Sequence, residues 1–336
     1  MVTQGINIIK GYCPTCEKED ADIELIQGTE VLNIRDESIP VETSYYQCQK
    51  CASKFDSPDA PDYMKEAYRI YRQRKHLLQP EEIATYRKQY DLTQRELSRL
   101  LGWGDVTISR YENGALQNEG QNAELKLAFE PANLMRLIAE NPTVLHEDKV
   151  KPLLEILKNE TRKNYLMNSL EMLLDYEADI LSGYKTADIG RIINAVLFFC
   201  EQTEVARTKM YKLLFYADSK HFKDYTVSIT GLRYAHLPLG PVPDKHNYCF
   251  SALTQIDPAL AIEERQWSEV IGEVFMAKRR PDLSLFVDSE LKTLLYVKEF
   301  FESYSAKGIS DFSHNEIGYI KTNTGQLIPY SFPVSI

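Results

Sequence analysis

Hydrophobic and polar positions follow different periods in different parts of the chain. Near the start, three short stretches rich in β-branched and aromatic residues predict strands: IELI (23–26), EVLNI (30–34) and SYYQC (44–48). From Tyr63 onward the apolar positions recur at helical spacing, with Ala67, Ile70 and Tyr71 on the same stripe. The pattern therefore predicts an N-terminal β region followed by a mainly helical chain.

Short helices with clear start and stop signals follow this first amphipathic helix. Pro80 is typical of a first helical turn, and Thr93 opens a capping box. Gly102 allows a tight turn, after which Asp105 is expected to cap a last short helix that ends at Gly114. Two short helices around a glycine turn are the layout of a helix-turn-helix unit.

The second half of the chain is also predicted to be mostly helical. Leucine-rich stripes between residues 118 and 183 indicate helices that serve as a structural connector or a dimer brace. A new domain is expected to begin near Tyr184, with a buried helix that includes IINAVLFFC (192–200). Residues 309–332 place a Thr-Gly turn between two apolar stretches, which predicts a β-hairpin near the C-terminus.

The predicted fold class is therefore mainly α and multidomain. A small β ribbon comes first, a helix-turn-helix domain of the five-helix type follows, and a mostly helical domain with a small β-hairpin comes last. The expected boundaries are 1–57 for the ribbon, 58–140 for a linking helix and the helix-turn-helix domain, 141–183 for the connector and 184–336 for the last domain.

Composition places this chain among ordinary globular proteins. Of its 336 residues, 43% are hydrophobic and 26% are charged. We find no run of 18 apolar residues, and the N-terminus lacks the apolar core and small-residue cleavage site of a secretory signal. We therefore expect no membrane partner and a cytoplasmic location, where thiols stay reduced.

Two CxxC pairs near the N-terminus carry the strongest chemical signal. Cys13 and Cys16 form one pair, and Cys48 and Cys51 form the other, with 31 residues between the pairs. In a reducing compartment this pattern favours a metal site over disulfides, and four thiolates suit one structural Zn²⁺ per chain. A redox-active CxxC pair or free thiols are the alternatives. Metal binding would also explain how so short a β segment folds.

The segment LTQRELSRLLGWGDVTISRYENG (92–114) resembles the lambda-repressor-like (XRE) helix-turn-helix domain. The resemblance rests on the Thr-Gln start of its second helix, the LLG turn and the Ser-Arg-aromatic-Glu-x-Gly third helix. A generic helical hairpin is the alternative, but it would not require polar side chains opposite Ile108 and Tyr111.

This resemblance implies that residues at the start of the last helix read DNA in the major groove. Arg110 is expected to bind guanine, Thr107 and Val106 to contact thymine methyl groups, Gln94 to reach a phosphate or an adenine edge, and Asn113 to lie near the backbone. Glu112 is instead expected to brace the fold. Charge agrees, because residues 61–117 hold ten Lys and Arg against eight acids, in a chain of net charge −10.

Residues 13–117 together resemble the MqsA-type antitoxins, which join a YgiT-type zinc ribbon to an XRE domain. In that family the protein dimerises through the helix-turn-helix domain and represses its own operon, and the ribbon contacts the toxin in the best known cases. Val106 stands where the family can carry a polar, base-contacting residue, so the operator is expected to differ.

The last domain resembles the Panacea, or SocA-like antitoxin, domain that accompanies many unrelated toxins. The resemblance covers about residues 186–330 and rests on three segments: KMYKLLFYAD (209–218), GLRYAHLPLGPVPDKHNY (231–248) and SHNEIGY (313–319). It implies a toxin-binding surface, for which the candidates are Lys212, Tyr216, His236, Pro241 and His314. These residues are equally explicable as interior packing.

The sequence thus predicts an antitoxin of a type II toxin–antitoxin system, encoded by a bacterium or a phage. We expect it to bind its operator DNA as a homodimer and to neutralise a protein toxin. A stand-alone or phage-borne transcriptional regulator with a C-terminal protein-interaction domain is the alternative. An enzyme is not expected, because no nucleophile elbow, phosphate-binding glycine loop or HExxH motif occurs in the sequence.

Overall fold

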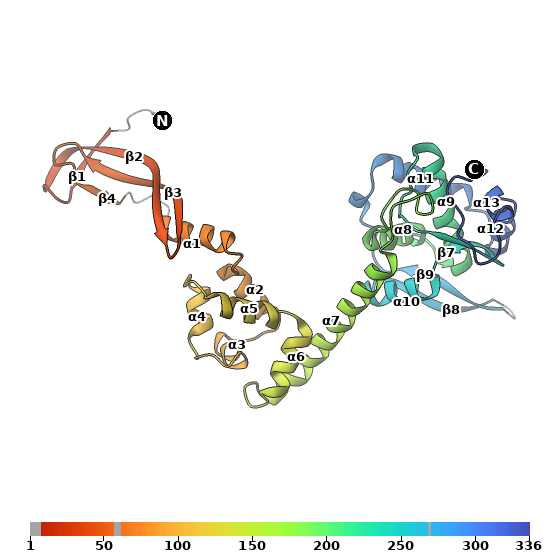
Figure 1. Cartoon of the computed structure of the whole chain (residues 1–336), viewed down its shortest axis with the longest axis horizontal. Helices are drawn as coiled ribbons and strands as arrows, with labels where there is room; N and C mark the ends of the chain where they lie inside the picture. The colour runs from red at the N-terminus through yellow and green to blue at the C-terminus, as the bar shows by residue number, and fades with distance from the viewer. Residues whose placement is uncertain (1–7, 57–61, 268–269) are drawn as a thin grey trace. The chain divides into compact units, whose positions relative to one another are not determined.

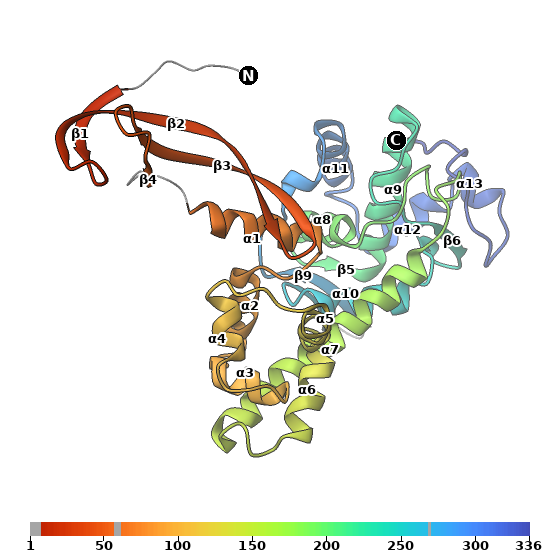
Figure 2. The same ribbon diagram turned by 60° about the vertical axis from the view of Figure 1, so that its left-hand side comes forward.

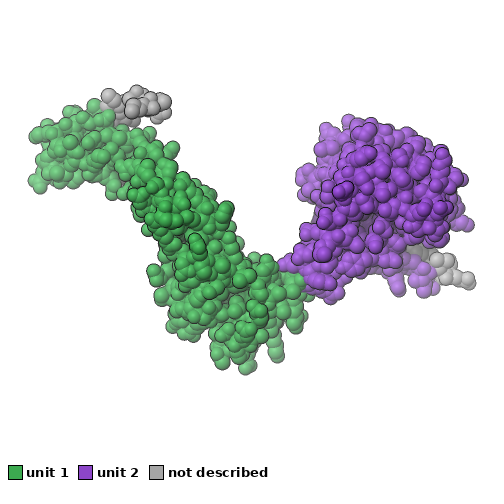
Figure 3. Space-filling view, viewed as in Figure 1, with its two compact units in different colours: residues 1–161 green, residues 162–336 purple. Residues whose placement is uncertain are grey.

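The computed structural model describes residues 8–56, 62–267 and 270–336 (Figure 1). The chain divides into two compact units, residues 1–161 and 162–336 (Figure 3). The division falls inside the connector that the sequence predicts for residues 141–183. Among the described helices, none has both the length and the apolar composition needed to span a bilayer.

The first unit begins with a four-stranded antiparallel sheet in the order β1-β2-β3-β4. Its strands are β1 (Ile8–Cys13), β2 (Lys18–Ile34), β3 (Glu37–Cys48) and β4 (Lys54–Asp56). The three predicted strand segments all lie in this sheet, although IELI and EVLNI belong to one continuous strand. The tip of the long β2–β3 hairpin lies against α1 (Tyr63–Arg74), where Ile34, Ile39 and Tyr71 share a small apolar core (Figure 2).

Helices make up the rest of the first unit. They are α2 (Pro80–Gln89), α3 (Gln94–Leu100), α4 (Thr107–Glu112), α5 (Glu119–Ala128) and α6 (Pro131–Glu140). The capping box is confirmed, since Thr93 Oγ1 accepts from the backbone N–H of Glu96 at 3.1 Å and the Glu96 carboxylate accepts from the N–H of Thr93 at 2.7 Å. Gly102 and Gly114 have φ of +71° and +100°, as the predicted turn and helix end require.

The predicted cap at Asp105 is wrong. Val106 occupies the N-cap position of α4, and no side chain caps that helix. The Asp105 carboxylate instead accepts hydrogen bonds from Arg95 at 2.6 Å and Arg99 at 2.7 Å, both on α3. A carboxylate between two guanidinium groups gains more than one that accepts a single backbone N–H, so the ion pairs determine its orientation.

Helix α7 (Glu147–Leu174) contributes to the cores of both units. Leu153 and Leu157 pack with the helices of the first unit, whereas Leu166, Leu170 and Leu174 belong to the core of the second.

The second unit packs helices around one large core with two small sheets. Helix α8 (Ile189–Cys200) is buried from Ile192 to Cys200, as its apolar sequence predicts. A three-stranded sheet has the order β5-β9-β8, and β6 pairs with β7 in a separate hairpin. The remaining bounds are β5 (Val205–Ala206), α9 (Arg207–Tyr225), β6 (Tyr234–Leu237), β7 (Gly240–Pro243), α10 (His246–Ile256), β8 (Leu260–Trp267), β9 (Val270–Ala277), α11 (Asp288–Phe300), α12 (Ala306–Ser313) and α13 (Ile317–Ile320).

The β-hairpin predicted for residues 309–332 is wrong. That segment contains most of α12 and all of α13, and in place of a hairpin of its own it forms one described β-bridge, from Leu327 to Ala235 on β6. Ser305 caps α12 by accepting from the N–H of Gly308 at 3.0 Å, and Ile309 is fully buried. The domain does contain small hairpins, but they are β6–β7 and β8–β9.

Candidate functional site

The four predicted cysteine ligands converge at one end of the N-terminal sheet. All four sulfur atoms lie within 4.8 Å of one another, with Sγ–Sγ distances of 3.6 Å for Cys13–Cys51 and 3.9 Å for Cys16–Cys48. Four thiolates arranged as a tetrahedron around a metal, with metal–sulfur bonds of about 2.3 Å, would be about 3.8 Å apart. The cluster therefore has the dimensions of a four-sulfur metal site.

Both CxxC turns have the same backbone geometry, as their identical spacing of cysteines predicts. The N–H of Glu17 donates to the carbonyl of Cys13 at 2.9 Å, and the N–H of Ala52 donates to the carbonyl of Cys48 at 2.8 Å. Each of these donor residues has a positive φ, 54° at Glu17 and 58° at Ala52. The two turns therefore present their thiols in the same way from β1–β2 and β3–β4.

The polar surroundings favour the thiolate form on part of this cluster. The backbone N–H of Cys16 lowers the pKa of Cys13 to about 6. The Ser53 hydroxyl, 3.1 Å from the Cys51 sulfur, lowers the pKa of that thiol as well. Thiolates are the metal-binding form of cysteine, so the donor set fits a metal ion.

The DNA-contact candidates lie on or beside α4. Val106 is 65% exposed, and Arg110, one turn further along, is exposed, with a guanidinium that makes no hydrogen bond or ion pair with any described residue. Thr107 is half-buried on the first turn of α4. Asn113 is exposed and donates to the Ser109 carbonyl at 2.8 Å. Arg110 is thus a free guanidinium on an exposed helix face.

Gln94 is placed differently from the other candidates. Its amide donates to the Glu112 carboxylate at 2.7 Å, and Arg87 donates to the same carboxylate at 2.6 and 2.9 Å. Glu112 therefore joins α2, α3 and α4, which is the bracing role that the sequence predicts for it. A DNA contact by Gln94 would use its carbonyl oxygen or its second amide hydrogen, since the first is bonded to Glu112.

Two arginines that the sequence does not single out hold the segment after α4. Arg35, in the tip of the β2–β3 hairpin, donates to the carbonyls of Gln117 at 3.0 Å and Leu116 at 3.1 Å. Arg72 on α1 is buried and donates to the carbonyl of Gly114 at 2.6 Å. The ribbon and α1 are therefore fastened to the C-terminal end of α4. The sequence gives no short-range signal for such contacts, because their partners lie 42 to 82 positions apart.

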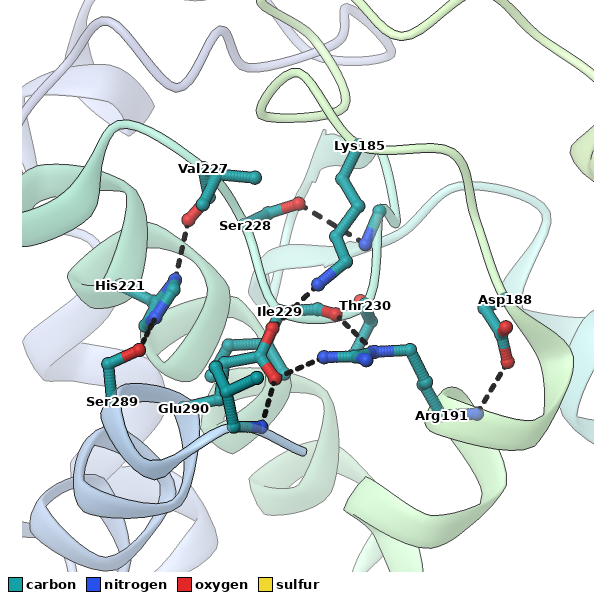
Figure 4. Close-up of polar contacts among 12 residues, drawn as sticks. Lys185, Asp188, Arg191, His221, Val227, Ser228, Ile229, Thr230, Ser289 and Glu290 are labelled. Atoms are coloured by element: carbon teal, nitrogen blue, oxygen red, sulfur yellow. Dashed lines mark hydrogen bonds and ion pairs between the residues drawn. The ribbon is translucent and has the colours of Figure 1, made fainter. Parts of the chain in front are cut away.

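A buried carboxylate organises one side of the second unit (Figure 4). Glu290 on α11 accepts from Lys185 at 2.6 Å, from Arg191 on α8, and from the backbone N–H of Val287 at 3.0 Å. Burial alone would raise the pKa of Glu290, but these donors reverse that effect and its pKa lies below the usual value. The network is fully paired and serves to hold α8, α11 and the loop before β6 together.

Most candidates for toxin contact lie inside the second unit. Lys212 and Tyr216 on α9 have no exposed surface, and Pro241 is buried in β7. His236 and His314 are half-buried, and both rings stack on Tyr319, with centroid distances of 3.7 and 4.8 Å. These positions favour interior packing over direct contact at the surface for Tyr216 and Pro241, and Lys212 is covered in the same way although its ammonium lacks a described partner.

Comparison with protein families finds one match in each of two parts of the chain. Residues 12–148 match the MqsA family, described as the antitoxin component of a bacterial toxin–antitoxin system. Residues 210–318 match the antitoxin SocA-like, Panacea domain. The chain thus carries a region similar to the MqsA-type antitoxins, followed by a region similar to the SocA-like Panacea domain. Searches of curated proteins and of solved structures found no significant match.

The two matched regions contain every candidate site. The four cysteines and the DNA-contact candidates on α3 and α4 lie in the MqsA-type region, and the toxin-contact candidates lie in the Panacea domain. The domain order expected from the sequence is therefore confirmed, and both families support an antitoxin role for this chain.

Proposed function

We propose that this protein is the antitoxin of a type II toxin–antitoxin system. In this proposal it binds and neutralises a protein toxin and binds operator DNA to repress its own operon. The observation that carries the proposal is the presence of two antitoxin families in one chain, one over residues 12–148 and the other over residues 210–318.

The metal of the ribbon is proposed to be one Zn²⁺ per chain with a structural role. Four sulfur donors with the spacing of a tetrahedron suit zinc, and a closed four-sulfur shell leaves no open position for catalysis. Cys13 and Cys48 are buried beside Ala21 and Ile23, which form a very small apolar core. Metal binding would supply the folding free energy that such a core lacks.

The DNA-binding part is proposed to be a helix-turn-helix unit formed by α3 and α4. Support comes from the exposed face of α4, where Val106 and the unpaired Arg110 lie one turn apart. Arginine binds guanine through two parallel hydrogen bonds, so Arg110 is the proposed main base contact. A single unit of this kind binds weakly, and we propose a homodimer that reads two half-sites of a palindrome.

Toxin neutralisation is proposed to belong to the Panacea domain. The domain is larger than the ribbon, and the family to which it is similar is defined as an antitoxin domain. The ribbon is then a scaffold for the DNA-binding helices, to which Arg35 fastens it.

Co-expression tests this proposal directly. The protein encoded by the gene next to the antitoxin gene is expressed alone and together with the full chain, and cell growth is measured. The proposal is supported if the neighbouring protein alone arrests growth and the full chain relieves that arrest. A neighbouring product that is harmless, together with specific operator binding by the chain, would instead indicate a stand-alone transcriptional regulator.

A further inference from the structure

A cavity in the Panacea domain lies between the start of α9 and the β6–β7 hairpin. Its volume is about 440 Å³, within the range of binding pockets for small groups. Three basic side chains, Arg207, Lys212 and His246, line it together with apolar side chains of the hairpin that include Leu237 and Leu239. No acidic residue is among the described residues that line it.

Lys212 is the unusual member of this set. Its side chain has no exposed surface, and its Nζ has no hydrogen-bond partner among the described residues. The hairpin closes over the ammonium at Gly240, where a Cβ would lie 2.8 Å from the Lys212 Cε and the backbone φ is +94°. The position therefore requires glycine, which allows the hairpin backbone to approach the lysine.

We expect this lysine to weaken the fold. Burial lowers its pKa to about 7, because the charged form is poorly solvated there. An unpaired polar group in a protein interior costs free energy, whereas methionine would fill the same space at no such cost. A buried amine that lies beside a cavity and stabilises nothing around it is typical of a functional site.

Arg207, the permanently charged side chain among the other two, already has partners. Arg207 donates to the Tyr211 hydroxyl at 2.6 Å and to the Asn247 side chain at 2.7 Å, and it also pairs with Glu273. Lys212 is therefore the cation that remains available to form an ion pair with a bound ligand. A single point charge beside apolar walls suits a carboxylate on an apolar stem, whereas a phosphate requires more donors.

The rim of the cavity offers a place for the apolar stem. Leu239 is 62% exposed at the tip of the hairpin. The Ser310 hydroxyl donates a hydrogen bond to the Leu239 carbonyl at 2.6 Å. Because the Lys212 ammonium has no exposed surface, a carboxylate reaches it only with a small displacement of this tip. Neighbouring exposed Pro238 offers further apolar contact there.

We propose that this cavity receives a carboxylate of the protein toxin, from an acidic side chain or the chain terminus, with Lys212 as its counter-ion. Leu237 and Leu239 then contact the apolar stem that carries the carboxylate. This inference rests on the proposed function and identifies the chemistry of the partner at that site.

The first experiment does not depend on the identity of the toxin. Hexanoate and its uncharged analogue hexanamide are titrated into the full chain, labelled with ¹³C at Leu and Val methyl groups and observed by NMR. Saturable shifts of the Leu237, Leu239 and Val242 methyl signals with hexanoate are expected, and weaker or no shifts with hexanamide. Equal responses to both probes, or no saturable response, would overturn the proposal.

Two lysines on the same helix give a matched pair of variants. Lys212→Met should remove the hexanoate response and raise the melting temperature, because it replaces an unpaired buried amine. Lys209→Met should lower the melting temperature and keep the response, because Lys209 donates to the carbonyl of Tyr304 at 2.7 Å and does not line the cavity. If Lys212→Met instead lowers the melting temperature and keeps the response, Lys212 is a structural residue and the proposal is wrong.

The second experiment measures affinity for the neighbouring gene product by calorimetry. Lys212→Met should weaken binding roughly tenfold or more, as the loss of a buried charge partner does. Leu239→Ala should weaken it less, and Lys209→Met should leave it unchanged. Unchanged affinity in Lys212→Met, with tight binding by the wild-type chain, overturns the inference about the cavity but leaves the neutralising function standing. No binding by the wild-type chain counts against the proposed function, and the hexanoate result then decides the inference by itself.

Discussion

Arg87 on α2 and Glu112 at the end of α4 form a two-pronged ion pair, with N–O distances of 2.6 and 2.9 Å. Only 13% of the arginine side chain and 8% of the glutamate side chain are exposed. Burial alone would raise the pKa of Glu112, but Arg87 and Gln94 hold that pKa below its usual value. Glu112 therefore stabilises the first unit when ionised, and this stabilisation is lost as the pH falls through its lowered pKa.

Glu112→Gln should destabilise the first unit by roughly 3 kcal/mol, because it leaves the covered Arg87 without its counter-ion. Urea unfolding of the full chain, followed by circular dichroism, measures this loss. Glu66→Gln is the matched control, because its partner Arg69 is half exposed and such surface pairs contribute about 1 kcal/mol or less. Similar losses in both variants would contradict the bracing role of Glu112.

Cys48→Ser is expected to abolish metal binding and unfold the N-terminal sheet, while the helices of both units stay folded. The ribbon has only a few buried apolar side chains, so it depends on the metal for stability. Elemental analysis of the purified protein should give one zinc per wild-type chain and none for the variant. Cys200→Ala, which changes a buried thiol outside the cluster, should retain the metal. Wild-type protein without zinc would contradict this assignment.

Arg110→Ala is expected to relax operator specificity at one base pair by about 1–3 kcal/mol. The reason is that Arg110 is a free, exposed guanidinium on α4. Binding to the operator and to single-base variants can be measured by fluorescence anisotropy at fixed salt. Arg136→Ala removes another exposed arginine, on α6, and should leave the sequence preference intact. The same ranking of operator variants by wild-type and Arg110→Ala protein would rule out a base contact.

A fragment of residues 162–336 should bind the toxin and fail to repress transcription. This fragment retains Leu166, Leu170 and Leu174, which belong to the core of the second unit. A shorter fragment, 184–336, should fold less stably because it lacks these three leucines. Pull-down of the neighbouring gene product and thermal unfolding test both statements. Rescue of growth by residues 1–161, with no binding by residues 162–336, would assign neutralisation to the ribbon half instead.

Lys212 should give the Panacea domain a distinct pH dependence. Its folded pKa of about 7 lies below that of an unfolded lysine, so the unfolded chain binds more protons between pH 7 and about 10.4. Stability should therefore rise over this range, by about 1.4 kcal/mol per pH unit at most. Other titratable groups at the cavity are Tyr211 and His246, whose pKa values burial raises and lowers respectively, and the permanently charged Arg207.

The matching measurement compares the pH dependence of wild-type protein with that of Lys212→Met. Melting temperatures between pH 7 and 10 should converge as the pH rises, because the free-energy cost of removing the Lys212 proton on folding falls as the pH approaches the pKa of unfolded lysine. A constant difference between the two proteins across this range would show that Lys212 does not titrate as inferred.

Features encoded within a few residues were predictable from the sequence. The capping box at Thr93 and the glycine turns at Gly102 and Gly114 depend on local chemistry, and the structure contains all three. The convergence of the cysteines was also predictable, because two identical CxxC turns at the ends of paired strands leave little freedom.

Features that depend on packing were not predictable in the same way. The short apolar runs in residues 309–332 fit strands and helices equally well, and the decisive signal was Ser305 as a helix cap. The sequence alone favours Asp105 as a helix cap, since its partners Arg95 and Arg99 approach it only when α3 and α4 pack. Lys212 carries a charge that suggests a surface position, yet every residue of α9 from Met210 to Ser219 is buried.

Arg35 and Arg72, which come from the ribbon hairpin and from α1, both bind carbonyl groups in residues 114–117. This arrangement limits how the gene can recombine. A crossover between the ribbon and α1 would bring in a foreign hairpin and leave the carbonyls of Leu116 and Gln117 without their donor. The ribbon and the helices after it are therefore expected to be inherited together, as one exchangeable module.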